Sequence, residues 1–201
     1  KANEKLSIAF LYGLYTDTSS YVDLYKKHDI AMRDELSKDY PELDKFLENL
    51  WETMYEADGV GLAAPQVGRN IRIFVVDASV NADKDPSLAG FKKAFINAHI
   101  YERSGDAVPF DEGCLSLPGI NERVERPSRI RIRYADENFV EHDEEFEGFA
   151  ARVIQHEYDH LDGKLFIDHV SPLRRTLLKS KLAAMTKGKY KAHYPCKLVK
   201  K

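Results

Sequence analysis

Two histidines four residues apart are the strongest chemical signal in the sequence. They stand in the run Gln155–His160, which reads QHEYDH. On a helix, His156 and His160 project from the same face one turn apart, so both imidazoles can reach one metal ion. Glu157 lies about 100° further round such a helix, where it can reach a water on the metal. This is the HExxH pattern of metal-dependent hydrolases; the alternative is a helix with surface or core histidines.

A catalytic metal needs three protein ligands and one open position. Cys114, within EGCLSLPG at 112–119, is a better third candidate than Asp168 or His169, which follow the second histidine. Gly113 before the cysteine lets the backbone approach closely. A thiolate with two imidazoles forms a soft N₂S donor set that suits zinc or Fe(II). The alternative is that the cysteine is a small buried hydrophobe.

A third segment, Gly59–Gly68 (GVGLAAPQVG), is rich in small residues. It lacks the Lys-Ser/Thr ending of a phosphate-binding loop. Small residues let the backbone approach a ligand, and Gln66 carries an amide that can donate to a developing oxyanion. The alternative is a helix end that runs into a strand, with small residues there for packing.

The elements that must position these segments follow from the apolar pattern. A helical stripe runs from Pro41 to a stop at Gly59, and strand patterns occur at 71–77, 94–101, 129–134 and 139–146. Two further helices are expected, at 149–161 before Gly163 and from Ser171–Pro172 to Met185; a short helix could begin at 21–25. Strands cluster rather than alternate with helices, which favours an α+β fold. We expect a mostly antiparallel sheet packed around the HExxH helix, with an N-terminal and a C-terminal helix.

Length and charge exclude several classes of protein. The 201 residues are 43% hydrophobic and 31% charged, as in an average globular domain, with a net charge of −3. This charge provides no strong field for DNA or an anionic membrane, and no segment is long enough to span a bilayer. Two cysteines are too few for a disulfide scaffold, and Cys196 is expected to be a free or buried thiol. Lys5 before the apolar run 6–15 faintly resembles a signal peptide, but no small-residue cleavage site follows.

Together the three segments GVGLAAPQ at 59–66, EGCLS at 112–116 and QHEYDH at 155–160 resemble the motifs of the peptide deformylase family, in the family's order. The resemblance runs from about residue 30 to 187 and implies one catalytic domain at 29–187. An N-terminal extension at 1–28 and a basic, solvated tail at 188–201 would flank this domain. One departure is Ile30–Arg33, which keeps an arginine but lacks the proline of the family's Pro-x-Leu-Arg segment.

The resemblance implies a hydrolase that removes the formyl group from N-formylmethionyl peptides of newly made proteins. Cys114, His156 and His160 would hold one ion per chain, with Fe(II) as the native metal and zinc or nickel able to replace it. Glu157 would take a proton from the metal-bound water and pass it to the leaving amine. A cytoplasmic, bacterial location is expected, with a targeted N-terminal extension as the alternative.

The remaining site residues would bind substrate and transition state. The oxyanion would be stabilised by Gln66 and the backbone N–H of Leu115. Backbone groups would meet the peptide as an added strand does, and an apolar pocket would take the methionine side chain. The backbone contacts are expected at Val60, Gly61 and Gly113, and the pocket at Phe110, Phe149 and Val153.

A supporting ion pair is expected between Arg126 and Asp159. Asp159 directly precedes a metal-ligand candidate, and Arg126 follows Cys114 by twelve residues. If both segments hold one metal, such a pair would fix the ligand strand to the ligand helix. The alternative is that Arg126 is a solvated residue at a strand end.

Two other functions share some of these features. A zinc endopeptidase has the same helix but does not require the other two segments, and a non-catalytic metal-binding protein would lack a ligand or the base. The last helix is basic and could contact ribosomal RNA, although a solvated face is the simpler interpretation. Its basic residues are Arg174, Arg175, Lys179 and Lys181.

Overall fold

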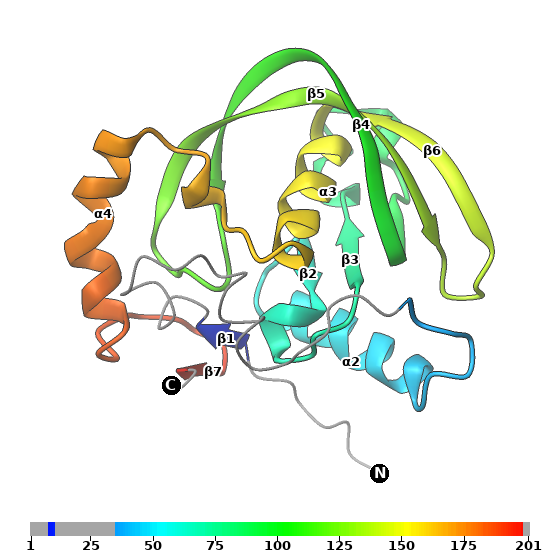
Figure 1. Cartoon of the computed structure of the whole chain (residues 1–201), viewed down its shortest axis with the longest axis horizontal. Coiled ribbons are helices and arrows are strands. Elements are labelled where there is room, and N and C mark those ends of the chain that lie inside the picture. Colours follow the sequence, from blue (N-terminus) through cyan, green and yellow to red (C-terminus); the bar gives the residue numbers. More distant parts are fainter. Residues whose placement is uncertain (1–7, 11–34, 199–201) are drawn as a thin grey trace.

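The computed structural model describes residues 8–10 and 35–198. Most of the expected N-terminal extension, the helix expected at 21–25 and the segment 30–33 lie outside the described residues. Three α-helices and seven strands are described (Figure 1): β1 Ile8–Phe10, α2 Leu43–Glu56, β2 Gly61–Ala63, β3 Ile73–Asp77, β4 Lys92–Gly113, β5 Asn121–Ala135, β6 Glu141–Glu147, α3 Gly148–Leu161, α4 Pro172–Met185 and β7 Cys196–Leu198.

The main sheet has five strands in the order β2-β3-β4-β5-β6, and every neighbouring pair is antiparallel. β4 and β5 form a long ribbon that arches over α3 (Figure 1). β1 and β7 make a separate parallel pair. The predicted α+β class with a mostly antiparallel sheet is therefore confirmed.

Strand β3 lies between two helices and is buried along its whole length. Phe74 and Val76 pack into one cluster with the apolar face of α3, whereas Ile73 and Val75 pack into another with α2. Because successive side chains of a strand point to opposite faces, a strand covered on both sides needs an apolar run like that of Ile73–Val76. This two-sided packing holds α3, which carries the HExxH segment, against the sheet.

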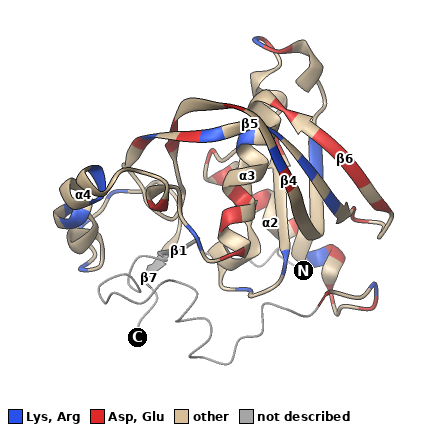
Figure 2. Cartoon of the chain, turned by 45° about the horizontal axis from the view of Figure 1, so that its top comes forward, with Lys and Arg blue, Asp and Glu red and all other residues tan. Residues whose placement is uncertain are grey.

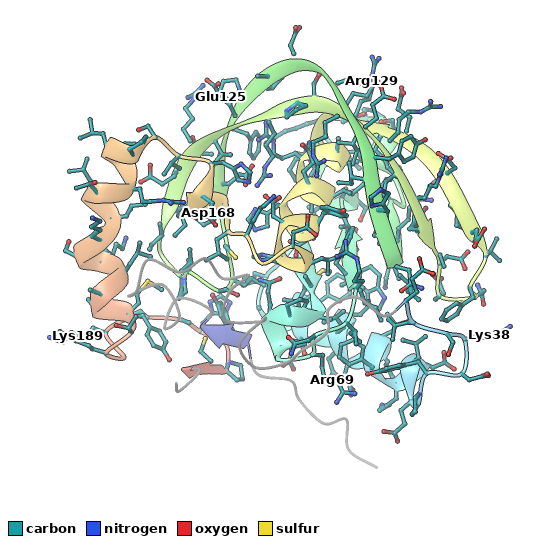
Figure 3. All side chains as sticks on the ribbon, in the orientation of Figure 1. Lys38, Arg69, Glu125, Arg129, Asp168 and Lys189 are labelled. Carbon is teal, nitrogen blue, oxygen red and sulfur yellow. The ribbon has the colours of Figure 1, made fainter. Side chains whose placement is uncertain are left out.

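Helix α4 packs on the segment that follows Cys114. Leu178, Leu182 and Met185 share a cluster with Leu117 and Ile120 of that segment. Ser171 caps the helix by accepting from the Arg174 backbone N–H, and Pro172 occupies its first turn, as predicted. The labelled Asp168 stands on the connection between α3 and α4 (Figure 3), where it accepts from Leu165 N–H at 2.8 Å.

Two strands are longer than the sequence pattern indicates. β4 continues from the predicted end at residue 101 to Gly113, and β5 begins at Asn121 rather than near 129. The added residues of β4 are mostly exposed, so they carry no apolar alternation. They are ordered by pairing with β5, in register from Ala107↔Pro127 to Gly113↔Asn121. Pairing of this kind is non-local, which explains why the local pattern misses it.

The tail that the sequence predicts to be solvated is so only in part: Lys191, His193 and Pro195 are exposed, whereas other residues pack against the protein. Tyr190 and Cys196 pack against the cluster beneath α4, and residues 196–198 form β7. Cys196 is a free thiol, as expected, and burial raises its pKa to about 11.

Charged residues are arranged in bands on the sheet (Figure 2). The acidic strand β6 lies beside β5, and arginines of β5 pair with acids of β6 across the exposed face; Arg133 Nε lies 3.0 Å from Asp143 Oδ2. Among the described residues, no helix is long and apolar enough to cross a membrane.

Candidate active site

Helix α3 and the end of β4 bring the three predicted metal ligands together. One ligand atom from each of Cys114, His156 and His160 lies within 4.8 Å of the others. His160 is fully buried, and its Nδ1 has no hydrogen-bond partner among the described residues. Burial lowers the pKa of His160 to about 3, so the ring is neutral and keeps a lone pair for a cation.

The spacing of these atoms fits one tetrahedral cation. Sγ of Cys114 lies 3.5 Å from Nε2 of His160. Metal–sulfur and metal–nitrogen bonds of ~2.3 and ~2.0 Å at the tetrahedral angle would separate the two atoms by about 3.5 Å. His156 points its Nδ1 at Glu112, which leaves Nε2 as the nitrogen available to a cation. The donors therefore fit a cation both in chemistry and in separation.

Glu112, for which the sequence indicated no role of its own, connects the two candidate ligand segments. Its carboxylate lies 2.9 Å from Nδ1 of His156 and accepts from Nε of Arg126 at 2.7 Å and Nη1 of Arg152 at 2.9 Å. Burial opposes ionisation, but the bonds to His156 and Arg126 hold the pKa of Glu112 well below its usual range. A carboxylate that accepts from the outer nitrogen of a ligand histidine fixes the orientation of that ring.

The expected ion pair between Arg126 and Asp159 is present. Nη1 of Arg126 lies 2.7 Å from Oδ2 of Asp159, and both side chains are buried. His169 also contacts this carboxylate, at 2.7 Å. Burial raises the pKa of Asp159, but His169 and Arg126 lower it to about 2. Arg126 is thus not a solvated strand-end residue: it joins β5 to β4 through Glu112 and to α3 through Asp159.

Arg152, which lies on the same face of α3 as the two histidines, belongs to the same network. Besides Glu112, its guanidinium donates to the backbone carbonyls of Val124 and Val108. Glu112 and Arg152 are charged residues that the strand and the helix bury, and the sequence alone does not reveal that burial. The two residues are hydrogen-bonded to each other but stand 40 residues apart along the chain, so no local sequence pattern reveals the contact.

Glu157 is buried beside the ligand cluster and lines the cavity described below. Its Oε2 has no hydrogen-bond partner among the described residues. A Cβ atom added to Gly61 would lie 2.6 Å from Oε1 of Glu157, so only glycine leaves room for this carboxylate. Burial raises the pKa of Glu157 to about 7.

The side-chain amide of Gln66 is held in one orientation. Its Oε1 accepts from the backbone N–H of Ala63 at 2.8 Å, within a short 3₁₀ turn after β2. Nε2 is thereby directed at Sγ of Cys114, 3.6 Å away, and at Oγ of Ser116, 3.2 Å away. The amide donor therefore faces the ligand cluster.

A cavity of about 570 Å³ opens onto these groups. All six residues predicted to bind substrate line it: Val60, Gly61, Phe110, Gly113, Phe149 and Val153. Leu115, Gln66, Glu157 and two of the ligand residues line it as well. Residues 191–194, which no pattern in the sequence marks, also form part of the wall. A tail rich in lysine gave no sign of that contact.

Comparisons with known proteins agree with this arrangement. The family model described as polypeptide deformylase matches residues 26–176. A peptide deformylase of Christiangramia forsetii is 48% identical over 167 residues, which cover 80% of this chain and 85% of that protein. Among solved structures, a peptide deformylase of Synechococcus elongatus in complex with actinonin has a TM-score of 0.69 at 32% identity and covers 91% of each chain.

A peptide deformylase of Thermus thermophilus is similar too, with a TM-score of 0.66 at 40% identity over 77% of this chain and 87% of that one. The family match covers well over half of the chain, and both ligand segments lie within the matched residues. The chain therefore belongs to the peptide deformylase family.

Proposed function

We propose that this chain removes the formyl group from N-formylmethionyl peptides with Cys114, His156 and His160 as metal ligands and Glu157 as the proton carrier. The observation that carries the proposal is the convergence of three ligand atoms beside a buried, unpartnered carboxylate at the wall of one cavity. A divalent cation held there would lower the pKa of a bound water and polarise the formyl oxygen.

The donor set supports Fe(II) as the native ion, with zinc or nickel able to occupy the same site. The three ligands account for one ion per chain. Glu112 and its arginine partners would keep His156 in the orientation that directs Nε2 at the ion.

Glu157 would accept a proton from the attacking water and return it to the amine that leaves. Its unpartnered Oε2 is the atom available for this transfer. The absence of a side chain at Gly61 supports the assignment, because any other residue would displace the carboxylate from the site.

Two donors support stabilisation of the tetrahedral oxyanion. One is Nε2 of Gln66, which faces the ligand cluster. The other is the N–H of Leu115, which lines the cavity and donates no backbone hydrogen bond to any described residue.

The cavity supports binding of a formylmethionyl chain end. Backbone at Val60, Gly61 and Gly113 would meet the peptide, while Phe110, Phe149 and Val153 would contact the methionine side chain. The rings of Phe110 and Phe149 lie 6.0 Å apart and make one apolar wall.

We place the reaction in the cytoplasm, where newly made chains carry the formyl group. A ribosomal contact through α4 has less support. Arg174 is paired with Glu122, Arg175 contacts Asp168, and Lys181 contacts the carbonyl of Gly119. These contacts favour a structural role for the basic side chains.

The proposal is tested by metal analysis and turnover of the peptide formyl-Met-Ala-Ser on protein prepared without air. We expect one iron per chain and release of formate, whereas Cys114→Ala protein should lose both. Cleavage of unformylated peptides would instead indicate an endopeptidase, and metal binding without any turnover would indicate a non-catalytic metal protein.

A further inference from the structure

The segment Lys191–Tyr194, between α4 and β7, forms part of the cavity wall. The same cavity is lined by Gly59–Gly61 and Gly113–Leu115, which are far from this segment in the sequence. None of the three motifs includes it, so any role it has in the reaction is additional to them.

This segment is fixed on both sides. Tyr190 before it and Cys196 after it pack against the cluster beneath α4. β7 then pairs with β1, from Ile8↔Cys196 to Phe10↔Leu198. At the rim, Nε2 of His193 lies 3.0 Å from Oδ2 of Asp58, on the loop between α2 and β2. Both rim side chains are largely exposed, so the pair adds little stability. The packing, rather than the rim pair, makes the segment a fixed wall.

One hydrogen bond joins this wall to the reaction centre. The hydroxyl of Tyr194 donates to the backbone carbonyl of Leu115 at 2.9 Å. On the other side of Leu115, the chain is held by a turn in which Leu117 N–H donates to the carbonyl of Cys114 at 2.9 Å. Leu115 therefore has a tied carbonyl and an N–H that faces no described backbone acceptor.

We propose that Tyr194 is a positioning residue for deformylation: its hydroxyl holds the Leu115 carbonyl so that the Leu115 N–H stays aimed at the oxyanion. The proposal rests on the oxyanion role proposed above for Leu115. Burial raises the pKa of Tyr194 well above its usual range, which keeps the hydroxyl protonated as a donor.

A loss of this hydrogen bond should affect the transition state more than substrate binding. The oxyanion forms only as the reaction proceeds, so a donor aimed at it contributes to kcat rather than to KM. Complete loss of one oxyanion donor costs roughly a hundredfold or more in kcat. A donor that remains but is less well placed should cost less, about tenfold.

The test compares Tyr194→Phe with the wild type and with a control, Tyr55→Phe. Tyr55 also donates one hydroxyl hydrogen bond, to Asp77 at 2.6 Å, but does not line the cavity. The three zinc-loaded proteins are assayed with formyl-Met-Ala-Ser, and zinc content and melting temperature are measured. We expect Tyr194→Phe to lower kcat about tenfold per bound zinc, with KM changed less than twofold. Tyr55→Phe should leave both constants unchanged.

A second variant tests whether the effect of Tyr194→Phe comes from lost packing rather than from the lost hydrogen bond. 4-Fluorophenylalanine at position 194 fills the space of the hydroxyl but cannot donate, and should lower kcat as Tyr194→Phe does. Wild-type kcat in either variant would overturn the proposal, and so would a fall in activity that matches a fall in zinc content. If the wild type and Tyr55→Phe turn over the formylated peptide, the proposed function stands whatever the result for Tyr194. If neither does, the proposed function itself fails.

Discussion

At the scale of single residues, the chemistry depends on a few buried charges that neutralise one another. Glu112 and Asp159 are balanced by Arg126 and Arg152 within one hydrogen-bonded network. Removing both partners of such a network can be tolerated, but removing one leaves an uncompensated charge in the interior. Glu157, the proposed proton carrier, lies beside this network and has no such partner at Oε2 among the described residues.

Glu157→Gln separates binding of the ion from proton transfer. The amide keeps the shape of the carboxylate but cannot accept a proton, so turnover should fall at least roughly a hundredfold. Metal content, measured by atomic absorption, should stay at one ion per chain because glutamine replaces no ligand. A variant with wild-type kcat would show that another group carries the proton.

Arg126→Ala should destabilise the fold strongly. The change leaves Glu112 and Asp159 without their shared guanidinium, which should cost on the order of 3–5 kcal/mol of unfolding free energy. Urea denaturation measures this cost. The control is Arg133→Ala, on the same strand as Arg126. It removes an exposed pair with Asp143 of β6 and should leave the denaturation midpoint unchanged. Equal midpoints for the two variants would contradict the structural role of Arg126.

At the scale of secondary-structure elements, α4 supports the Cys114 segment from behind. Leu182 of this helix is 1% exposed, whereas Leu177 on its outer face is 61% exposed. Both residues lie on one helix, so they form a matched pair.

Leu182→Ala should lower the free energy of unfolding by about 2–5 kcal/mol, because it opens a cavity in the cluster beneath the helix. Leu177→Ala should change it by no more than about 0.5 kcal/mol. Thermal melts of the two zinc-loaded variants measure the difference. A small effect of Leu182→Ala would mean that α4 is not part of the supporting core.

The helices α3 and α4, and the placement of His156 and His160 on one helix face, could be predicted from the sequence because their signals are local. The predicted ranges of α3 and α4 match the structure within a residue or so, since apolar spacing, Gly163 and the Ser171–Pro172 cap all lie inside or beside them. The extension of β4 beyond Tyr101 and the wall at Lys191–Tyr194 could not be predicted. Both depend on contacts with distant segments and have no periodic signature of their own.

The site residues divide in the same way. Cys114, His156 and His160 could be singled out as candidate metal ligands from residue type and spacing combined with the order of three motifs, and the structure brings them together. Glu112 and Arg152 could not, because a buried acid or arginine has meaning only beside its partner. The pair Arg126 and Asp159 could be anticipated by one further step: two segments that hold one metal must themselves lie close together.

At the scale of the whole molecule, the proposed metal joins segments far apart in the chain. Cys114 follows β4, and the two histidines lie on α3 beyond the entire β5–β6 hairpin. The three side chains lie close together only in the folded state. An ion that binds all three of them therefore stabilises the folded state.

Removal of the ion should therefore lower the melting temperature. Dialysis against a chelator is expected to lower it by several degrees, and addition of one equivalent of zinc should restore it. The control is Cys114→Ala, whose melting temperature should not respond to zinc. A melting temperature of the wild type that is unaffected by the chelator, despite loss of the ion, would contradict a shared site.

Iron-loaded protein should also lose activity in air faster than zinc-loaded protein. Fe(II) beside a thiolate reacts with oxygen, and the sulfur of Cys114 can then be oxidised. Timed assays of both forms, with mass spectrometry of the Cys114 peptide, measure this. If the iron-loaded and zinc-loaded proteins lost activity in air at the same rate, iron would not be the cause of oxidative inactivation.

The double-sided burial of β3 has a consequence for which sequences this fold accepts. Every position of Ile73–Asp77 faces packed side chains, whereas exposed and buried positions alternate along much of β5. In a saturation mutagenesis screen for folded protein, polar substitutions should therefore be rejected at each successive position from Ile73 to Val76 of β3. Along Asn121–Arg126 and Arg129–Tyr134 the accepted variation should instead rise and fall with a period of two residues.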